Sequence, residues 1–199
     1  MNIKPTSRNF PFDKADLDKA VETLRKGGVI VYPTDTIWGL GCDATNKEAV
    51  ERIYKIKQRS DSKALILLAD TDAMISNHVD NAPEVAWSIV ELSDKPTTVI
   101  FEKGKNLATN VLAADGSVAF RLTREEFSKQ LCHRLHRPVV STSANISGQP
   151  SPHCFKEISQ EIIDCADYVV AYRQDDTTPA SPSTIIKINN NSEVKIIRK

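Results

Sequence analysis

Apolar residues recur at helical spacing near the start of the chain. In the segment 13–26 they fall on one side of a helix, with Asp13 as the N-cap and Gly27-Gly28 directly after the last turn. The residues of this apolar stripe are Leu17, Ala20, Val21 and Leu24. The pattern predicts a helix that packs one face on a core.

Two further helices are predicted from capping boxes, in which a hydroxyl residue and a glutamate three positions later each bond the other's backbone N–H. Thr45-x-x-Glu48 opens a helix that runs to about residue 57, and Thr123-x-x-Glu126 opens another. Weaker helical patterns occur in two other segments, 72–78 and 83–91.

Short apolar runs with little polar alternation predict strands that are buried on both faces. The clearest runs are 29–32 (VIVY) and 64–69 (ALILLA). Other strands are expected at 97–101, 117–122, 138–141, 168–171, 184–188 and 194–197. Strands interleaved with helices are typical of an α/β protein with a mixed, open sheet.

Bulk properties narrow the class of protein. The chain has 199 residues without an internal repeat or a credible linker, so we expect one domain over residues 1–199. It contains no run of about 18 apolar residues that would span a membrane, and its N-terminus lacks the apolar core of a secretory signal. The four cysteines form no CxxC pair, which favours a reducing cytoplasm.

The formal net charge is zero, whereas proteins that cover themselves with nucleic acid are usually basic. Any anion-binding function therefore requires a local cluster of cations. Lys57, Arg59 and Lys63 form such a cluster between a predicted helix and a predicted strand. In an extended segment Lys57 and Arg59 point the same way, which suits a polyphosphate. A solvated helix end that complements the helix dipole explains the same residues.

Two other polar clusters follow predicted strands, where α/β sheets place ligand sites. They are PTDT at 33–36 and STSANISGQPSP at 141–152. Gly39 and Gly41 are expected to let the backbone pass close to a ligand, although both clusters are also ordinary turn sequences. The chain has neither a P-loop nor a G-x-G-x-x-G motif, so a nucleotide would be bound by another device.

A zinc site was weighed at Cys132 and His136, four residues apart on a predicted helix, with His153-Cys154 downstream. Two Cys and two His form a ligand set that zinc accepts. Adjacent residues, however, suit tetrahedral coordination poorly. A buried cysteine with surface histidines explains the pattern better, and we predict no metal site built by the protein.

Five motifs together resemble one protein family. They are KGGVIVYPTDTIWGLG (26–41), the K-x-R-x-x-x-K run (57–63), SVAFR (117–121), STSANISGQPSP (141–152) and PSTII (182–186). The motifs occur in the order found in the single-domain YrdC-like threonylcarbamoyl-AMP synthases, and the resemblance to this family covers nearly the whole chain. The sequence departs from the common family pattern at Trp38, Ala64 and Leu68.

The resemblance implies a YrdC/RibB-like fold, which is a twisted, open, mixed α/β sheet with flanking helices around a positively charged cavity. It implies that L-threonine, bicarbonate and ATP give L-threonylcarbamoyladenylate and pyrophosphate. Mg²⁺ is expected with the ATP, held mainly by phosphates and water. In the family, other tRNA-modification proteins pass the threonylcarbamoyl group to tRNA, and some members bind double-stranded RNA.

The resemblance also assigns residues. It implies threonine contacts at Thr34, Arg121, Ser143 and Ser183. It implies ATP contacts at Arg59, Lys63, Ser117, Asn145, His153 and Arg198. The implied catalytic cations are Lys57, Arg59 and Lys63. Arg121 is expected to pair with the threonine carboxylate in a two-pronged match that lysine cannot copy, and Asp35 is given a supporting role at most.

Two other functions remain alternatives at this stage. One is a non-catalytic RNA-binding module of the YciO type, whose cationic patch is widened by basic residues of a predicted helix. Those residues are Arg124, Lys129, Arg134 and Arg137. The other is a structural subunit of a tRNA-modifying assembly. The neutral net charge disfavours RNA as the main ligand, and the intact STSAN motif favours the synthase.

Overall fold

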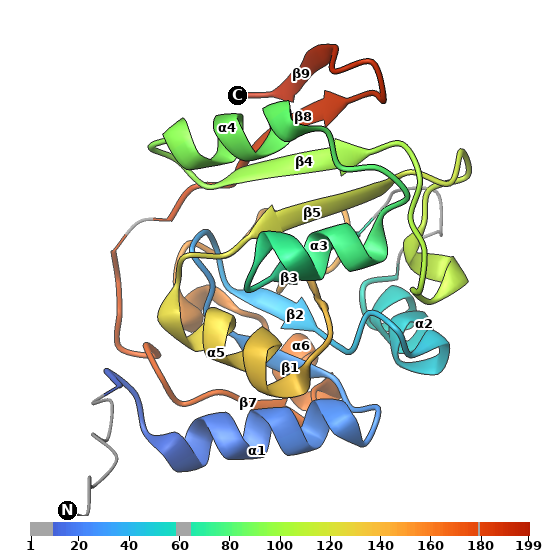
Figure 1. Ribbon diagram of the computed structural model, residues 1–199. Coiled ribbons are helices and arrows are strands. Elements are labelled where there is room, and N and C mark those ends of the chain that lie inside the picture. The colour runs from blue at the N-terminus through green and yellow to red at the C-terminus, as the bar shows by residue number, and fades with distance from the viewer. Residues whose placement is uncertain (1–9, 59–64, 179) are drawn as a thin grey trace, which may run out of the picture.

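Residues 10–58, 65–178 and 180–199 are described by the computed structural model, and they form nine strands (Figure 1). The strands are β1 (Ile30–Tyr32), β2 (Gly39–Gly41), β3 (Ile66–Ala69), β4 (Thr97–Phe101), β5 (Val118–Leu122), β6 (Val139–Ser143), β7 (Tyr168–Val169), β8 (Thr184–Ile188) and β9 (Val194–Arg198). They pair in the order β7-β1-β2-β6-β3-β5-β4-β8-β9, with three parallel and five antiparallel pairs. The predicted mixed, open sheet is confirmed.

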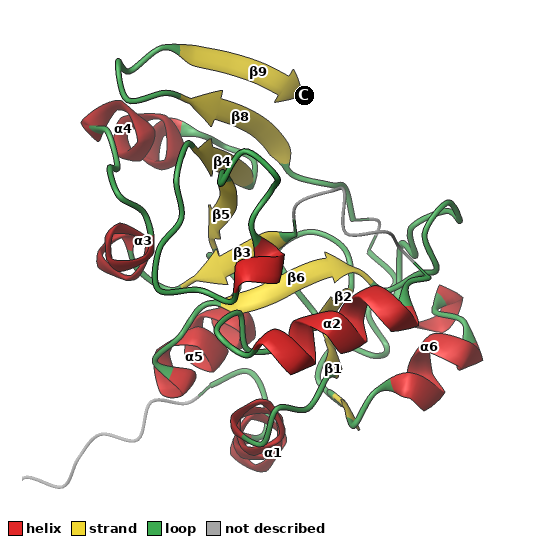
Figure 2. Cartoon of the chain, turned by 90° about the vertical axis from the view of Figure 1, so that its right-hand side faces the viewer, coloured by secondary structure: helices red, strands yellow, loops and turns green. Residues whose placement is uncertain are grey.

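Six α-helices formed by the described residues flank this sheet. They are α1 (Lys14–Arg25), α2 (Lys47–Ile56), α3 (Asp72–His78), α4 (Glu84–Leu92), α5 (Glu126–Leu135) and α6 (Gln160–Cys165). In Figures 1 and 2, α3 and α4 lie beside β4 and β5 at one end of the sheet, and α1 lies beside β1 and β7 at the other. None of these helices combines the length and apolar character that crossing a membrane requires.

Alternate residues of β1 divide the core into two layers. Val31, with Val29 just before the strand, belongs to a cluster that also contains apolar residues of α2, α3 and α4. Ile30 and Tyr32 belong to a second cluster, with residues of α1 and α5. All four side chains are fully buried. Burial on both faces explains why this segment is a continuous apolar run instead of an alternating one.

Helix α2 begins from Asn46, so the capping box predicted at Thr45 is wrong. The Oδ1 of Asn46 accepts a hydrogen bond from the N–H of Ala49 at 3.0 Å. The hydroxyl of Thr45 instead donates to Oδ1 of Asp43 at 2.7 Å. A carboxylate is a stronger acceptor than a neutral group, so Asp43 takes the Thr45 hydroxyl and leaves the cap to Asn46.

Helix α5 also begins from a residue that the sequence did not single out. The carboxylate of Glu125 accepts hydrogen bonds from the N–H groups of Phe127 and Ser128 at 3.1 and 2.7 Å. Burial raises the pKa of this carboxyl. The expected cap, Thr123, is buried, and its N–H donates to the carbonyl of Ala69 at 3.0 Å. Thr123 thus continues the pairing of β5 with β3 and lies outside the helix.

The predicted element boundaries agree closely elsewhere. Strands β4 and β8 have the predicted bounds, and the segments 72–78 and 83–91 form α3 and α4. The sequence missed β2 and α6. Strand β2 spans three residues, two of them glycine, and it is a strand only because β1 and β6 pair with its two edges.

Candidate functional site

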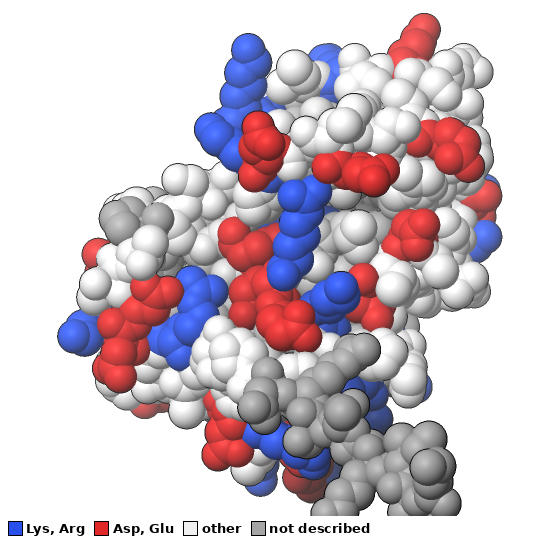
Figure 3. Space-filling view, turned by 60° about the vertical axis from the view of Figure 1, so that its left-hand side comes forward, with Lys and Arg blue, Asp and Glu red and all other residues white. Residues whose placement is uncertain are grey.

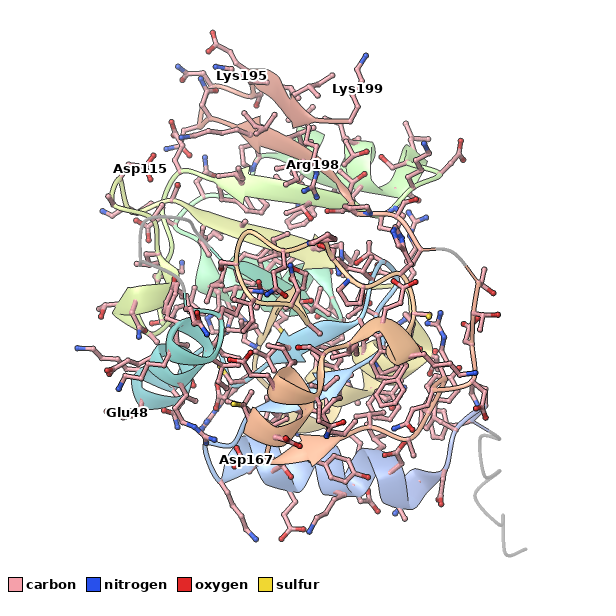
Figure 4. The ribbon with its side chains drawn as sticks, turned by 180° about the vertical axis from the view of Figure 1, so that it is seen from behind. Glu48, Asp115, Asp167, Lys195, Arg198 and Lys199 are labelled. Atoms are coloured by element: carbon pink, nitrogen blue, oxygen red, sulfur yellow. The ribbon has the colours of Figure 1, made fainter. Side chains whose placement is uncertain are left out.

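A cavity of about 550 Å³ opens on one face of the sheet. Its floor carries side chains from four neighbouring strands. Ser141 pairs with Ile66, Ile66 with Ala119, and Ala119 with Ile100. The outer rim includes Arg198 of the β8–β9 hairpin, which Figure 4 labels in a view from behind. Sheet pairing therefore brings residues from distant parts of the chain around one hollow.

The lining is rich in hydroxyl groups. Its polar and charged members in the described part of the chain are Thr36, Arg121, Ser141, Thr142, Ser143, Ser151, Ser183 and Arg198. They include two arginines and no aspartate or glutamate. An anion would meet two guanidinium groups and several hydroxyls at this site.

Arg121 lies on β5 and is almost fully buried. Its Nε is 3.0 Å from Oδ1 of Asp35, and the two side chains are 3% and 9% exposed. The contact is an ion pair without hydrogen-bond geometry: among the described residues, Nε and Nη2 of Arg121 and Oδ1 of Asp35 have no hydrogen-bond partner. A buried guanidinium nitrogen without a partner is costly. Since Arg121 lines the cavity, an anionic ligand there would supply the missing acceptor.

The PTDT stretch forms a tight turn after β1. Thr34 is 2% exposed, and its hydroxyl donates to the carbonyl of Ile37 at 2.8 Å while accepting from the N–H of Thr36 at 3.0 Å. Thr34 therefore holds the turn together. It borders a small second cavity together with His153, and the main cavity is lined by Thr36 and Ile37.

Gly41 has a different role from the one expected. A Cβ at Gly41 would lie 2.5 Å from the carbonyl oxygen of Val140 and 2.6 Å from the ring of Tyr32, so packing excludes a side chain there. Gly39 lines the cavity, and its Cβ would meet Tyr32, Thr34 and Ser141 at 3.3 Å. Approach to a ligand remains an explanation for Gly39 alone.

Lys57 does not lie in an extended segment, because it caps the C-terminus of α2 and Gln58 follows with φ 49°. Its ammonium group donates to the carbonyls of Ser143 and Asn145 at 2.6 and 2.7 Å, and lies 3.3 Å from the Asn145 Oδ1. The side chain is buried. Lys57 thus contacts the backbone of the segment that follows β6. Its catalytic role stays a prediction.

The 143–145 turn is closed by its own side chains. Ser143 lines the cavity, and its hydroxyl donates to Oδ1 of Asn145 at 2.5 Å. The Asn145 amide donates to the carbonyl of Gln149 at 2.6 Å. Gly148, with φ +87°, provides the left-handed position that this turn needs. The turn is therefore shaped before any ligand arrives.

Ser183 and Arg198, from the C-terminal part of the chain, also line the cavity. The Ser183 hydroxyl lies 2.8 Å from the hydroxyl of Thr98 on β4. Nε and Nη2 of Arg198 donate to the carbonyl of Ser183 at 3.1 and 2.8 Å. Thr98 was not identified from the sequence, because its only distinguishing feature there is a hydroxyl group at a strand position that is expected to be buried.

Two other predicted ligand residues lie apart from the lining. Ser117 sits in the turn before β5, where its N–H donates to Oδ1 of Asp115 at 3.0 Å. Its hydroxyl bond to the same carboxylate, together with that N–H, lowers the pKa of Asp115 to about 2. His153 is exposed and borders the small second cavity. Arg59 and Lys63 lie outside the described residues.

One of the residues considered for zinc, Cys132, has a different partner. Cys132 is buried, and its thiol donates to the carbonyl of Leu68 at 3.4 Å. Burial raises its pKa. The described residues contain no group of three or more His, Cys, Asp or Glu side chains arranged to hold a metal ion.

Comparisons with known proteins converge on one family. A family model named Sua5/YciO/YrdC, described as "Telomere recombination", matches residues 22–199. A threonylcarbamoyl-AMP synthase of Idiomarina loihiensis is 33% identical over 182 residues, covering 89% of this chain and 96% of the relative.

Two solved structures resemble the fold. The crystal structure of E. coli YciO matches with a TM-score of 0.80 and 26% identity, covering 94% of this chain and 90% of that one. P. abyssi Sua5 complexed with L-threonine matches with a TM-score of 0.76 and 24% identity, covering 88% of this chain. This chain spans only 52% of the P. abyssi protein.

Proposed function

Because the chain belongs to the Sua5/YciO/YrdC family, we propose that it is an L-threonylcarbamoyladenylate synthase. It would join L-threonine, bicarbonate and ATP into L-threonylcarbamoyladenylate and release pyrophosphate, for threonylcarbamoyladenosine modification of tRNA. The single observation that carries the proposal is Arg121, a buried guanidinium with an unpartnered nitrogen in a cavity lined by hydroxyls.

The amino acid would bind at Arg121. A carboxylate there gives Nη2 the acceptor that it lacks, and a paired charge-assisted bond is among the stronger contacts in proteins. Ser143 and Ser183 line the same cavity and supply hydroxyl groups. Thr34 would act indirectly, by holding the turn that carries Thr36 and Ile37 into the lining. A related protein, P. abyssi Sua5, has been crystallised with L-threonine.

ATP would occupy the part of the cavity near Arg198. That guanidinium is at the exposed rim, where it can meet a phosphate without the full cost of burial. The family implies Arg59 and Lys63 as further phosphate contacts. Asn145 would contribute by fixing the turn that presents Ser143. Direct ATP contacts by Ser117 and His153 have the weakest support, because neither is among the described residues that line this cavity.

Mg²⁺ would enter with the nucleotide. The described lining residues include no carboxylate, so they do not make the oxygen cage that Mg²⁺ needs from a protein. Triphosphate oxygens and water are the ligands it prefers in nucleotide sites. Bound in that way, the ion would neutralise charge on the phosphates.

The chemistry requires alignment more than acid–base catalysis. A carbamate oxygen of N-carboxythreonine attacks the α-phosphorus of ATP, a new P–O bond forms, and the bond to pyrophosphate breaks. Such a transfer is accelerated by holding the reactants in line and by neutralising phosphate charge. Guanidinium groups and hydroxyls on rigid strands are suited to that task.

The product would then be handed to other tRNA-modification proteins that transfer the threonylcarbamoyl group to tRNA. We place this activity in the cytoplasm. Supporting this, all four cysteines are free of disulfides, which suits a reducing compartment.

The alternative of an RNA-binding module is weakened by the basic residues of α5 and its flanks. Arg124 donates to the carbonyls of Val90 and Ser93, Arg134 pairs with Asp18, and Arg137 pairs with Asp43. Figure 3 shows basic and acidic side chains interleaved over one face of the molecule. Internal pairing leaves less free positive charge for a phosphate backbone.

The test is pyrophosphate release. We expect release only when L-threonine, bicarbonate and ATP are all present, and loss of the threonine-dependent rate in Arg121→Ala. Release that ignores L-threonine would contradict the synthase assignment. Absence of turnover together with tight binding of double-stranded RNA would favour the RNA-binding module.

A further inference from the structure

The pair between Asp35 and Arg121 is unusual in this protein for its burial. Of the ion pairs between described residues, it alone has both side chains at least nine-tenths buried, at 9% and 3% exposure. Removing a charged pair from water costs free energy that only good geometry and further contacts offset. A buried pair beside a cavity therefore calls for a role beyond stability.

The two partners come from different parts of the fold. Arg121 is fixed on β5, paired with Leu68 of β3 and Thr98 of β4. Asp35 sits in the turn after β1, between Thr34 and Thr36, whose side chains and backbone bond each other at 3.0 Å. The turn thus holds the Asp35 carboxylate at the guanidinium from a rigid position.

The contact leaves part of the guanidinium unused. Oδ1 of Asp35 lies 3.0 Å from Nε as an ion pair, and neither Nε nor Nη2 has a hydrogen-bond partner among the described residues. The attraction between the two charges limits how the guanidinium can turn, and because the group is flat its five N–H donors then have restricted directions. The remaining donors are then aimed before a ligand binds, which reduces the ordering cost of binding.

We propose that Asp35 is a positioning residue for the substrate amino acid: its carboxylate holds the Arg121 guanidinium through a buried ion pair, so that the N–H donors without a partner receive the substrate carboxylate. This role rests on the proposed function and deepens it. Asp35 acts only through Arg121, since it is not among the described residues that line the cavity.

The experiment measures L-threonine and ATP binding separately by calorimetry. Asp35→Ala is expected to weaken L-threonine binding about tenfold or more, since a charge-assisted anchor is lost, while ATP affinity stays within about twofold. Asp35→Asn keeps the shape of the side chain but removes the charge of the ion pair, so it should weaken L-threonine binding about as much as Asp35→Ala does. The matched control is Asp80→Asn, which alters an exposed ion pair with Lys103 and should change neither affinity.

Asp35→Glu guards against a poorly folded alanine variant. It keeps the charge but moves it by one methylene, so L-threonine binding should weaken about tenfold with ATP binding unchanged. If the variants bind L-threonine as tightly as wild type, or lose ATP affinity equally, the positioning role is overturned. If wild type itself binds no L-threonine, the proposed function fails and the positioning role falls with it.

Discussion

Lys57 and Arg121 are two cations with the same 3% exposure and different states. The ammonium of Lys57 is held by two carbonyls and an amide oxygen of residues 143–145. The guanidinium of Arg121 has one carboxylate 3.0 Å from Nε as an ion pair, and within the described structure neither Nε nor Nη2 has a hydrogen-bond partner. The ammonium group of Lys57 is bonded to other parts of the protein, whereas Arg121 has guanidinium N–H donors that a ligand could use.

The difference shows how a fold separates structural charge from functional charge. A buried cation whose donors are all taken stabilises the segment that surrounds it. A buried cation with a donor left over is destabilised until a ligand completes its shell. Charge and burial alone do not distinguish the two, but the hydrogen-bond partners do.

The largest expected effect is at Arg121. Arg121→Lys keeps a positive charge but removes the flat fork and the Nε contact. We expect kcat/KM for L-threonine to fall about 100-fold or more, with ATP binding nearly unchanged. Pyrophosphate release at varied L-threonine measures this. A fall of less than about threefold would mean that the free guanidinium donors are not used.

Substitution of Lys57 should mainly lower the stability of the fold. Lys57→Met leaves the carbonyls of Ser143 and Asn145 without their donor, so we expect the free energy of unfolding to drop by about 2–4 kcal/mol. Urea denaturation measures it. The control is Lys55→Met on the same helix, an exposed residue paired with Glu51, with a change below about 0.5 kcal/mol. An inactive Lys57→Met protein of wild-type stability would return Lys57 to a catalytic role.

Arg198 is an exposed cation at the cavity. Its substitution tests whether such a cation contributes to ligand binding while contributing little to the stability of the fold. Arg198→Ala is expected to weaken ATP binding about tenfold, because a phosphate contact is lost. The free energy of unfolding should fall by less than about 1 kcal/mol, since the side chain is exposed. Calorimetry with ATP measures the first and urea denaturation the second. Lys195→Ala on the same strand, outside the described lining, should leave ATP affinity unchanged.

The smallest effect concerns Asp115, whose bonds to Ser117 are local, unlike those of Lys57 to Ser143 and Asn145. The folded pKa, about 2, lies below its ordinary value, so this carboxylate stabilises the fold above about pH 4, and the effect disappears as pH falls through about 2. Because the side chain is 59% exposed, solvent screening should hold the contribution below about 1 kcal/mol. Urea denaturation of wild type and Asp115→Asn should show a gap at pH 7 that narrows toward pH 2. A gap that widens on acidification would refute the assignment.

Much of the fold was readable from local pattern. The stripe of α1 and most of β4 are buried as expected, because side-chain period and burial are coupled within one element, whereas in β8 only Ile186 and Ile188 are buried. Caps were less predictable. Thr45 and Thr123 each met a stronger tertiary or local partner, and Asn46 and Glu125 took the cap positions instead.

The candidate site was readable in part. Four of the residues that the family resemblance assigned, Arg121, Ser143, Ser183 and Arg198, line one cavity, and their contacts with ligands stay predictions. The sequence did not reveal that the hydroxyl of Thr34 and the ammonium group of Lys57 donate hydrogen bonds to backbone carbonyls. It also gave Asp35 too small a part, because the contact with Arg121 joins two segments far apart in the chain.

Residue types and their order thus determined which elements form, the family, and which side chains are chemically able to bind an anion. The tertiary structure alone decided which of those side chains still have donors to offer. The physical reason is that a hydrogen-bonding group is used up by whichever partner the fold brings within about 3 Å, and strand pairing between distant segments sets that partner.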